Sequence, residues 1–329
     1  MSAWARWLRA PQKTWLRRAI FQVHLWTGLA LGLYVLVLSL TGSVLVYRIE
    51  IDRFLASPRA ALDEKATPMT ADRLRAAAAR AYPGWTVTAV HEGSYRAGQG
   101  RGPRRAPDPT ASIILEGAGQ RKERLFNPYS GVDLGDGFTQ GQSALLWVTS
   151  LHDDLLLGRP DGTRVNGGLS LLFTLIVLTG AVVWWPGVAR WKRGLSVKVT
   201  SGWKRFNWDL HSALGFWTLA FMMMWGVSGW YLGMPDLLTD LVERWSDPDG
   251  PIGERPGDLF LQWLTRLHFG RWRDPAWGPW LKGVWAFVGL VPAVMFVSGL
   301  VMWWNRVVRP RQGRRPPGEA PDIAGNTSS

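Results

Sequence analysis

Four long stretches without a charged residue constrain this chain of 329 residues more than any other feature. Each contains 23 to 29 consecutive uncharged, mainly apolar residues, and they lie between Arg18 and Arg48, Arg164 and Arg190, Asp209 and Asp236, and Lys282 and Arg306. At a rise of about 1.5 Å per residue, each can cross a hydrocarbon core about 30 Å thick. The sequence therefore predicts an all-α integral membrane protein with four transmembrane helices, and it excludes a soluble globular protein.

The boundaries of the spans follow from the positions of the flanking charges. We expect the transmembrane helices at residues 19–47, 165–189, 210–235 and 283–305. The intervening and terminal segments are then 1–18, 48–164, 190–209, 236–282 and 306–329. An even number of spans places both termini on the same side of the membrane.

The net charge of +13 is distributed unevenly along the chain. All of it lies in three segments, 1–18, 187–209 and the tail from residue 305, whereas 48–164 and 234–282 together carry 22 basic and 22 acidic residues. Because basic flanking segments stay in the cytoplasm, we expect both termini to be cytoplasmic. A basic chain can also bind nucleic acid, but topology already explains these charges. We therefore expect the lipid bilayer, and no nucleic acid, as a partner.

Cysteine is absent, which excludes disulfides, thiolate catalysis and cysteine-ligated zinc or iron–sulfur centres. Tryptophan is abundant, with 22 residues. Tryptophan collects at membrane interfaces, where one side of the ring is dry and the other is hydrated. Composition therefore agrees with a membrane protein.

The first outer segment is long enough for a small domain. The pattern predicts a helix over 68–82, strands over 85–92, 112–116 and 121–135, and a flexible basic linker at 96–109. We expect an α+β domain without catalytic chemistry, in which His91 on the first strand is structural. Residues 140–157 should form an amphipathic helix, and 234–280 should form short helices at the membrane surface.

An internal repeat relates the first and third spans. His24 is followed by Gly28 and then by the pair Thr41-Gly42, whereas His211 is followed by Gly215 and then by Ser228-Gly229. In both spans a glycine follows the histidine by four residues. The glycine of the hydroxyl–glycine pair follows the histidine by 18 residues in both spans.

The second and fourth spans share another pattern. His152 precedes Thr179-Gly180, and His268 precedes Ser298-Gly299. The distance from the histidine to the glycine is 28 residues in the first case and 31 in the second. The sequence therefore predicts two parallel halves of two spans each, with the larger outer insertion in the first half. Four of the five histidines of the chain occupy equivalent positions in these halves.

Histidines at membrane spans are expected to be functional, since an unpaired polar group is costly there. Two pairs at matched depth, His24 with His211 and His152 with His268, suit haem b, whose iron can take two axial imidazoles. Gly28 and Gly215 lie on the same helical face as their histidines and would leave room for a flat macrocycle. Alternatively, the histidines anchor helix ends and the glycines permit close packing.

Other kinds of site fit the sequence less well. Zinc needs three or four ligands at one point, but these histidines divide between two membrane faces. A proton relay would need acidic residues, and the four spans contain none. A small-solute permease would need broken helices, and the sequence shows no evident break.

With these motifs in view, residues from about 15 to 308 resemble the PepSY-associated transmembrane family, which includes inner-membrane ferric-siderophore reductases. The most specific matches are the motifs around His24, His152, His211 and His268. The first outer segment resembles a PepSY domain, a helix followed by strands that end in FNPYSGVDLG, although the insertion at 96–109 departs from the pattern.

The resemblance implies a multi-pass protein of the bacterial inner membrane with a PepSY-like periplasmic domain between spans one and two. It implies two haem b groups with His24, His211, His152 and His268 as axial ligands, and electron transfer outward to a ferric siderophore. Some relatives carry a fused flavoprotein domain, but this chain has no Gly-x-Gly-x-x-Gly after a strand. We therefore expect a separate electron donor, either a quinol or a reductase.

The leading functional hypothesis is a haem-dependent ferric-siderophore reductase that releases Fe(II) during iron uptake. The competing hypothesis is a non-enzymatic module, in which the spans only anchor a PepSY-like domain that binds or regulates an extracytoplasmic partner. If electrons leave on the outer side, the exit surface should include the tryptophans and arginines near His268. These are Trp263, Arg271, Trp272, Arg273, Trp277 and Trp280.

Overall fold

The computed structural model describes residues 7–55, 67–91, 110–244, 246, 251, 253–270, 272 and 276–308. The chain divides into two compact units. The helical unit comprises Met1–Tyr47 and Val148–Ser329, and the α+β unit comprises Arg48–Trp147. The expected linker at 96–109, Arg271, Arg273 and the tail from 309 lie outside the described residues.

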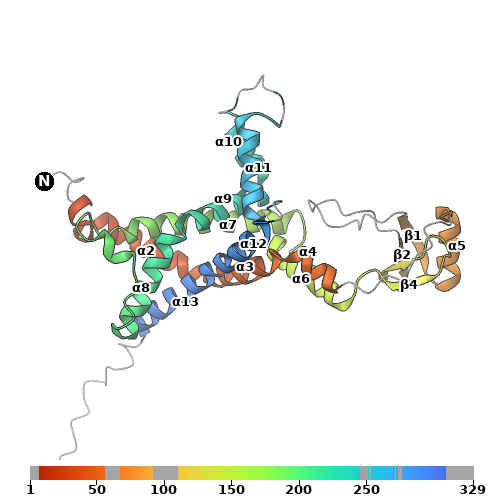
Figure 1. Ribbon diagram of the computed structural model, residues 1–329, viewed down its shortest axis with the longest axis horizontal. Helices are drawn as coiled ribbons and strands as arrows, with labels where there is room; N and C mark the ends of the chain where they lie inside the picture. Colours follow the sequence, from red (N-terminus) through yellow and green to blue (C-terminus); the bar gives the residue numbers. More distant parts are fainter. Residues whose placement is uncertain are drawn as a thin grey trace, which may run out of the picture. The chain divides into compact units, whose positions relative to one another are not determined.

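The helical unit contains the four apolar runs (Figure 1). Its candidate membrane-crossing helices are α7 (Asp161–Trp184) and the stretch Gly278–Val308, which joins α12 (Gly278–Gly289), α13 (Val291–Trp303) and a final π-helical turn. The other runs form bent pairs, and these are α2 (Trp15–Ala30) with α3 (Gly32–Leu45) and α8 (Gly202–Trp217) with α9 (Leu219–Gly233). The described residues thus contain two candidate spans, or up to four if each bent pair is one span.

Each bent pair breaks at one residue, Leu31 in the first and Thr218 in the second. The helix axes turn by 61° and 64° at these positions. Each break lies seven residues after a histidine, His24 or His211. The sequence showed no sign of these breaks, since neither contains a proline.

Local hydrogen bonds from hydroxyls accompany the bends. The hydroxyl of Thr218 donates to the carbonyl of Leu214 (2.7 Å), and Thr27 donates in the same way within α2. Such bonds from a hydroxyl to the preceding turn bend helices, and a glycine lies three residues before each break. The amides of Leu31 and Thr218 still donate to carbonyls of the preceding turn, at 2.9 and 3.0 Å. The breaks are therefore bends and not unwound segments.

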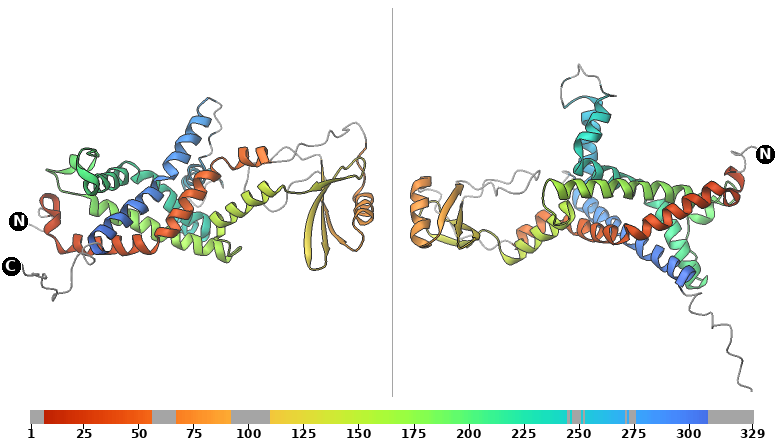
Figure 2. Two further views of the ribbon diagram at one scale, coloured as in Figure 1. Left: turned by 90° about the horizontal axis from the view of Figure 1, so that it is seen from below. Right: turned by 180° about the vertical axis from the view of Figure 1, so that it is seen from behind.

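The bends let each pair contact two neighbours. In the first pair α2 packs along α7, whereas α3 packs along α12 and α13. In the second pair α8 packs along α13, whereas α9 packs along α7. Figure 2 shows α7 beside α9, and α3 beside α13, from two further directions.

Small residues permit the close approach of α7 and α9. A Cβ on Gly233 would lie 2.5 Å from Cα of Gly167 and from the carbonyl oxygen of Thr163. A Cβ on Gly229 would lie 2.7 Å from Oγ of Ser170. Without a strong hydrophobic force between helices in lipid, close packing of small residues holds helices together.

Two further helices, α10 (Pro235–Glu243) and α11 (Pro256–His268), follow α9. Each has proline in its first turn, where no amide hydrogen is needed. They bury Leu238, Leu261 and Leu264 in a common cluster. The described residues of the segment 234–280 thus contain two short helices, and their position at the membrane surface stays a prediction.

The α+β unit contains α4 (Arg48–Leu55), α5 (Ala71–Ala81) and an antiparallel sheet. The strands are β1 (Thr86–His91), β2 (Ala111–Gly117), β3 (Gln120–Phe126) and β4 (Asp133–Asp136), paired in sequence order. The core consists of the fully buried side chains Leu74, Ala78, Ala111, Ile113, Leu115 and Phe126. The first residues of α6 (Gln140–Asp154) also belong to this unit.

The predicted elements of this unit are present, with bounds that differ by one to three residues. The expected helix over 68–82 is α5, and the expected strands coincide with β1, β2, and β3 with β4. The turn between β3 and β4 forms because Oδ1 of Asn127 accepts from the amides of Tyr129 and Ser130, at 2.9 and 3.2 Å. Gly131, with φ of 68°, provides the left-handed residue that closes it.

Candidate functional site

His24 lies on α2 with its ring against α7. Its Nδ1 is 3.1 Å from the carbonyl oxygen of Ile176 and 3.2 Å from Oγ1 of Thr179. Thr179 belongs to the hydroxyl–glycine pair that the sequence singled out in the second span. The histidine of one apolar run is thus held by the hydroxyl of the next.

His211 lies on α8 and makes the corresponding contact with α13. Its Nδ1 is 2.7 Å from Oγ of Ser298. One turn earlier on α8, the buried Asn207 donates from Nδ2 to the carbonyl of Ser298 at 2.9 Å. Two hydrogen bonds therefore fix α8 against the pair Ser298-Gly299.

The remaining two histidines come from the helices outside the apolar runs. His152, near the end of α6, places Nδ1 2.9 Å from Oγ1 of Thr41 on α3. His268, the last residue of α11, places Nδ1 2.7 Å from Oγ of Ser228 on α9. Each of the four hydroxyl–glycine pairs therefore holds one histidine.

Glycine lets three of these rings lie close to a helix backbone. A Cβ on Gly42 would be 2.9 Å from Cε1 of His152, and one on Gly180 would be 3.0 Å from Cε1 of His24. For Gly299 the distance to Cε1 of His211 is 3.5 Å, an ordinary contact. Gly229 differs, because a Cβ there would meet Ser170.

The glycines on the histidine-bearing helices have another environment. A Cβ on Gly28 would meet no atom of the described residues within 4 Å, and one on Gly215 would meet only the flexible end of Met295, at 3.1 Å. Packing of the described residues therefore does not require a glycine at Gly28. At Gly215 a larger residue would only have to displace the end of the Met295 side chain.

The helix α13 packs against both α2, which carries His24, and α8, which carries His211. All four histidines that contact hydroxyls are half-buried. The described residues contain no group of three or more His, Asp or Glu side chains arranged to hold a metal ion among themselves.

A partly buried polar network, which the sequence analysis missed, connects α3, α7 and the end of α6. The hydroxyl of Tyr34 donates to Oδ1 of Asn166 at 2.8 Å and lies 3.0 Å from Oγ of Ser170. Nδ2 of Asn166 donates to the carbonyl of His152 at 2.8 Å. Asn166 fixes the backbone that carries His152, and its polar side chain inside an uncharged run was the available signal.

The remaining residues that the sequence singled out are His91 and the tryptophans near His268, and they differ in exposure and contacts. His91 is on β1, paired with Ser112 on β2. Trp263, Trp277 and Trp280 are exposed by 50%, 67% and 76%. Trp272 stacks edge-on against Trp285 instead.

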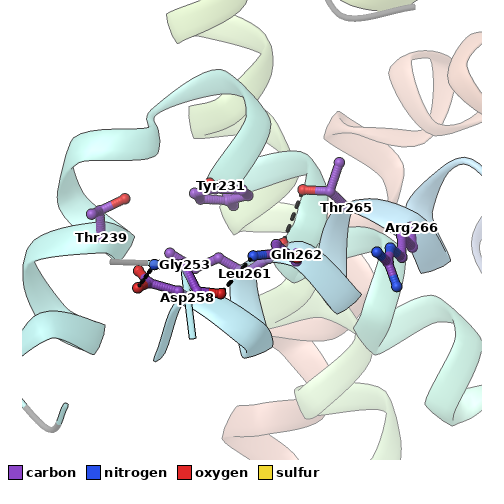
Figure 3. Close-up of a pocket in the computed structure, with 8 residues that line it drawn as sticks. All are labelled: Tyr231, Thr239, Gly253, Asp258, Leu261, Gln262, Thr265 and Arg266. Atoms are coloured by element: carbon purple, nitrogen blue, oxygen red, sulfur yellow. Dashed lines mark hydrogen bonds between the residues drawn. The ribbon is translucent and has the colours of Figure 1, made fainter. Parts of the chain in front are cut away.

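A cavity of about 480 Å³ lies between the end of α9 and helices α10 and α11 (Figure 3). Its lining residues are Tyr231, Thr239, Gly253, Asp258, Leu261, Gln262, Thr265 and Arg266. None of the four hydroxyl-bound histidines is among these described lining residues.

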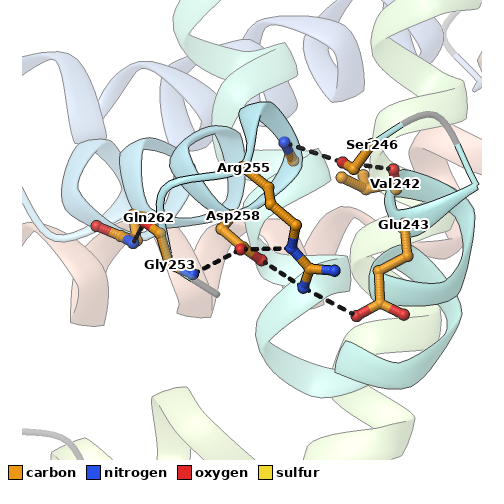
Figure 4. A network of polar contacts seen from close by, with 8 residues as sticks. Val242, Glu243, Ser246, Gly253, Arg255, Asp258 and Gln262 are labelled. Atoms are coloured by element: carbon orange, nitrogen blue, oxygen red, sulfur yellow. Dashed lines mark hydrogen bonds and ion pairs between the residues drawn. The ribbon is translucent and has the colours of Figure 1, made fainter. Parts of the chain in front are cut away.

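An ion-pair network stabilises the start of α11 beside this cavity (Figure 4). Nε of Arg255 donates to Asp258 at 3.0 Å, and the amide of Gly253 donates to the same carboxylate at 2.8 Å. The hydrogen bond from Arg255, followed by that from Gly253, lowers the pKa of the Asp258 carboxyl. Glu243 on α10 extends the network, with its carboxylate 3.9 Å from Arg255. The groups are satisfied among themselves, which indicates a structural role.

Comparison with known proteins identifies the family. The sequence model of the PepSY-associated TM region matches residues 21–256 and 245–306, which together cover most of the chain. No curated protein matches the chain. The match includes all four hydroxyl-bound histidines and confirms the resemblance inferred from their motifs. The chain is therefore a multi-pass membrane protein that belongs to the family of the PepSY-associated TM region.

Proposed function

We propose that this protein is a di-haem b electron-transfer protein of the bacterial inner membrane that reduces ferric siderophores on the periplasmic side. In this proposal each bent helix pair is one span, so that four spans form two parallel halves. Both termini are cytoplasmic, and the α+β unit is a PepSY-like periplasmic domain. The charge distribution supports this orientation, because the whole net charge of +13 lies in the three segments assigned to the cytoplasm.

The observation that carries the proposal is the arrangement of four histidines in two sets. His24 and His211 contact hydroxyls on α7 and α13, whereas His152 and His268 contact hydroxyls on α3 and α9. In every case Nδ1 is engaged, which leaves Nε2 as the nitrogen that can bind a metal.

The donor set and the space at Gly28 fit haem b. Two neutral imidazoles could hold a haem b, which would supply reversible one-electron transfer when bound. His24 and His211, on two helices that both pack against α13, would hold one group, and His152 and His268 the other. Gly28 would leave the face of α2 open for the macrocycle, because a Cβ at this position has no described protein atom within 4 Å.

Reduction of the substrate needs little further chemistry. Oxygen donors of a siderophore bind the hard ion Fe(III) far better than Fe(II), so one electron added to the iron weakens the complex and releases Fe(II). No bond of the organic chelator is broken. The chain has to accept electrons from a separate quinol or reductase and to dock the chelate on its outer surface. Exposed Trp263, Trp277 and Trp280 are candidates for that surface.

An optical spectrum of the purified full-length protein, with a haem-to-protein ratio, tests the proposal. We expect two haems per chain and a reduced spectrum typical of low-spin haem b. A colourless protein would contradict the proposal and favour a non-enzymatic module that binds an extracytoplasmic partner.

Substitution of single histidines tests the pairing. His24→Ala and His211→Ala should each lose the same haem and retain the other. His268→Ala should abolish reduction of a membrane-impermeant ferric siderophore while the His24–His211 haem remains reducible from the cytoplasmic side. His91→Ala, in the α+β unit, is the control that should retain both haems. Loss of different haems from the His24 and His211 variants would refute this pairing.

A further inference from the structure

The hydroxyl that contacts each histidine also donates a hydrogen bond to its own helix. The acceptors are carbonyl oxygens three or four residues earlier. The four pairs are Thr41 with Val37 (2.7 Å), Thr179 with Ile176 (2.9 Å), Ser228 with Met224 (2.6 Å) and Ser298 with Met295 (3.0 Å). Because a hydroxyl has one hydrogen and two lone pairs, only lone pairs remain for the histidine.

This arrangement fixes the tautomer of each imidazole. With the hydroxyl as acceptor, Nδ1 has to be the protonated nitrogen, so that Nδ1–H donates. His24 gives independent support, because its Nδ1 also lies 3.1 Å from the Ile176 carbonyl, which can only accept. In a neutral ring with Nδ1 protonated, Nε2 has the free lone pair. All four histidines are thus prepared to bind a metal through Nε2.

Within each half of the chain, two histidine–hydroxyl contacts run in opposite directions between the same two stretches of sequence. In the first half, His24 on α2 contacts Thr179 on α7, and His152 contacts Thr41 on α3. In the second half the corresponding contacts are His211 with Ser298 and His268 with Ser228. Each half therefore orients two histidines, one from each of the proposed pairs.

We propose that Thr41, Thr179, Ser228 and Ser298 are positioning residues that hold the four imidazoles as Nδ1–H tautomers and set their strength as haem ligands. This inference rests on the proposed function. Hydrogen bonding at Nδ1 increases the basicity of a histidine ligand and so favours the ferric state. Each haem would be held by one threonine-bound and one serine-bound histidine, because the threonines lie in the first half and the serines in the second.

Redox titration of the full-length protein tests this role. Ser298→Ala should raise the midpoint potential of the His24–His211 haem, since it removes the hydroxyl acceptor for Nδ1–H of His211. Thr179→Val should raise the potential of the same haem by a smaller amount, because the Ile176 carbonyl still accepts from Nδ1–H of His24. Thr41→Val and Ser228→Ala should raise the potential of the other haem. Ser43→Ala is a matched control, because Ser43 lies on α3 and donates to the carbonyl of Ser39 (2.9 Å) without contacting a histidine. The conservative variants Thr41→Ser and Ser298→Thr should restore potentials close to wild type.

A second measurement separates this inference from the proposed function. Full-length protein labelled with ¹⁵N-histidine, produced in a haem-deficient host, should show the Nδ1–H tautomer by NMR at four of five histidines. Ser298→Ala should remove that preference at one of them. Wild-type protein that never binds haem but shows the four tautomers would refute the proposed function and the role in haem ligation, and would support the tautomer assignment alone. Two bound haems whose potentials are unchanged in all four variants would overturn the positioning role and leave the proposed function intact.

Discussion

Gly180 lies next to the imidazole of His24, and the space between the two residues is too small for an added side chain. A Cβ would come within 3.0 Å of Cε1 of His24, and for Gly42 the corresponding distance to His152 is 2.9 Å. Both values are shorter than ordinary van der Waals contact. Because the hydroxyl beside each glycine holds Nδ1, the ring has little freedom to retreat.

Alanine at these glycines should therefore displace a histidine. We expect Gly180→Ala to weaken the haem of the His24–His211 pair, and Gly42→Ala to weaken the other, as measured by haem-to-protein ratio and low-spin spectrum. Gly299→Ala is the matched control, since its Cβ would lie at 3.5 Å from His211, an ordinary contact. Equal haem content in all three variants would show that these glycines do not set the ring positions.

Gly28 allows a second prediction at the residue scale. A Cβ there meets no described protein atom within 4 Å, so Gly28→Ala should not lower the thermal stability of haem-free protein. In haem-loaded protein the added methyl group should shift the spectrum of the His24–His211 haem, because it would lie against the macrocycle. An unchanged spectrum would remove Gly28 from the candidate binding residues.

At the scale of elements, the contact between α7 and α9 depends on backbone proximity. A Cβ on Gly233 would lie 2.5 Å from Cα of Gly167 and from the Thr163 carbonyl. These are backbone atoms, so no rotation of a flexible side chain can relieve the clash. The two helices would have to separate along a contact made of small residues.

Gly233→Ala should therefore destabilise the helical unit by about 1–3 kcal/mol, the usual cost of overpacking. The measurement is thermal unfolding of the full-length protein in detergent. Gly168→Ala on α7 is the control, since its Cβ would meet nothing within 4 Å among the described residues. If both variants melted at the same temperature, close packing at Gly233 would not contribute to stability.

An ion pair links β3 and β4 in the α+β unit. Nη2 of Arg124 donates to Asp133 at 2.7 Å, and the hydroxyl of Tyr82 donates to the same carboxylate. Burial acts to raise the pKa of the Asp133 carboxyl, but hydrogen bonds from Arg124 and then Tyr82 outweigh it, so the pKa is lowered. Asp136 also pairs with Arg124 but its side chain is 71% exposed.

The lowered pKa of Asp133 predicts acid sensitivity of this unit. A carboxyl with a lowered folded-state pKa stabilises the fold above its unfolded pKa of about 3.9, and this stability is lost as the pH falls further. Asp133→Asn should destabilise the sheet at neutral pH and reduce its loss of stability in acid. Amide hydrogen exchange of β3 and β4 in the full-length protein, corrected for intrinsic rates, measures both effects.

A matched variant separates the two carboxylates. Asp136→Asn should have little effect on exchange, because exposed ion pairs contribute at most about 1 kcal/mol. Equal effects of the Asp133 and Asp136 variants would show that burial of the Arg124–Asp133 pair is not what stabilises the sheet.

At the scale of the whole molecule, the natural absence of cysteine makes topology directly measurable. Gln120 in the α+β unit and Thr200 before α8 are both exposed. Gln120→Cys should react with a membrane-impermeant maleimide in intact spheroplasts, because the two segments assigned to the outer side, 48–164 and 234–282, together carry no net charge. Thr200→Cys should react only after permeabilisation, since it lies in a basic segment. The reverse pattern would invert the proposed orientation.

Much of the local structure could be predicted from sequence. Uncharged length indicated the membrane helices, and turn residues such as Asn127 and Gly131 located the β3–β4 turn. Periodic spacing also picked out the four histidines and the four hydroxyl–glycine pairs. These signals are local, because they depend on the residues of one helix, strand or turn.

Spacing along the chain could not show which hydroxyl contacts which histidine. His24 and Thr179 are 155 residues apart, and their contact depends on the packing of α2 along α7. The polar network around Asn166 likewise depends on tertiary packing, because it joins residues of three helices. The sequence by itself determined the membrane class, the charge asymmetry and the set of candidate ligands, because these follow from composition and order. Only the tertiary structure decided the partner of each imidazole, because that depends on how closely small residues allow two helices to approach.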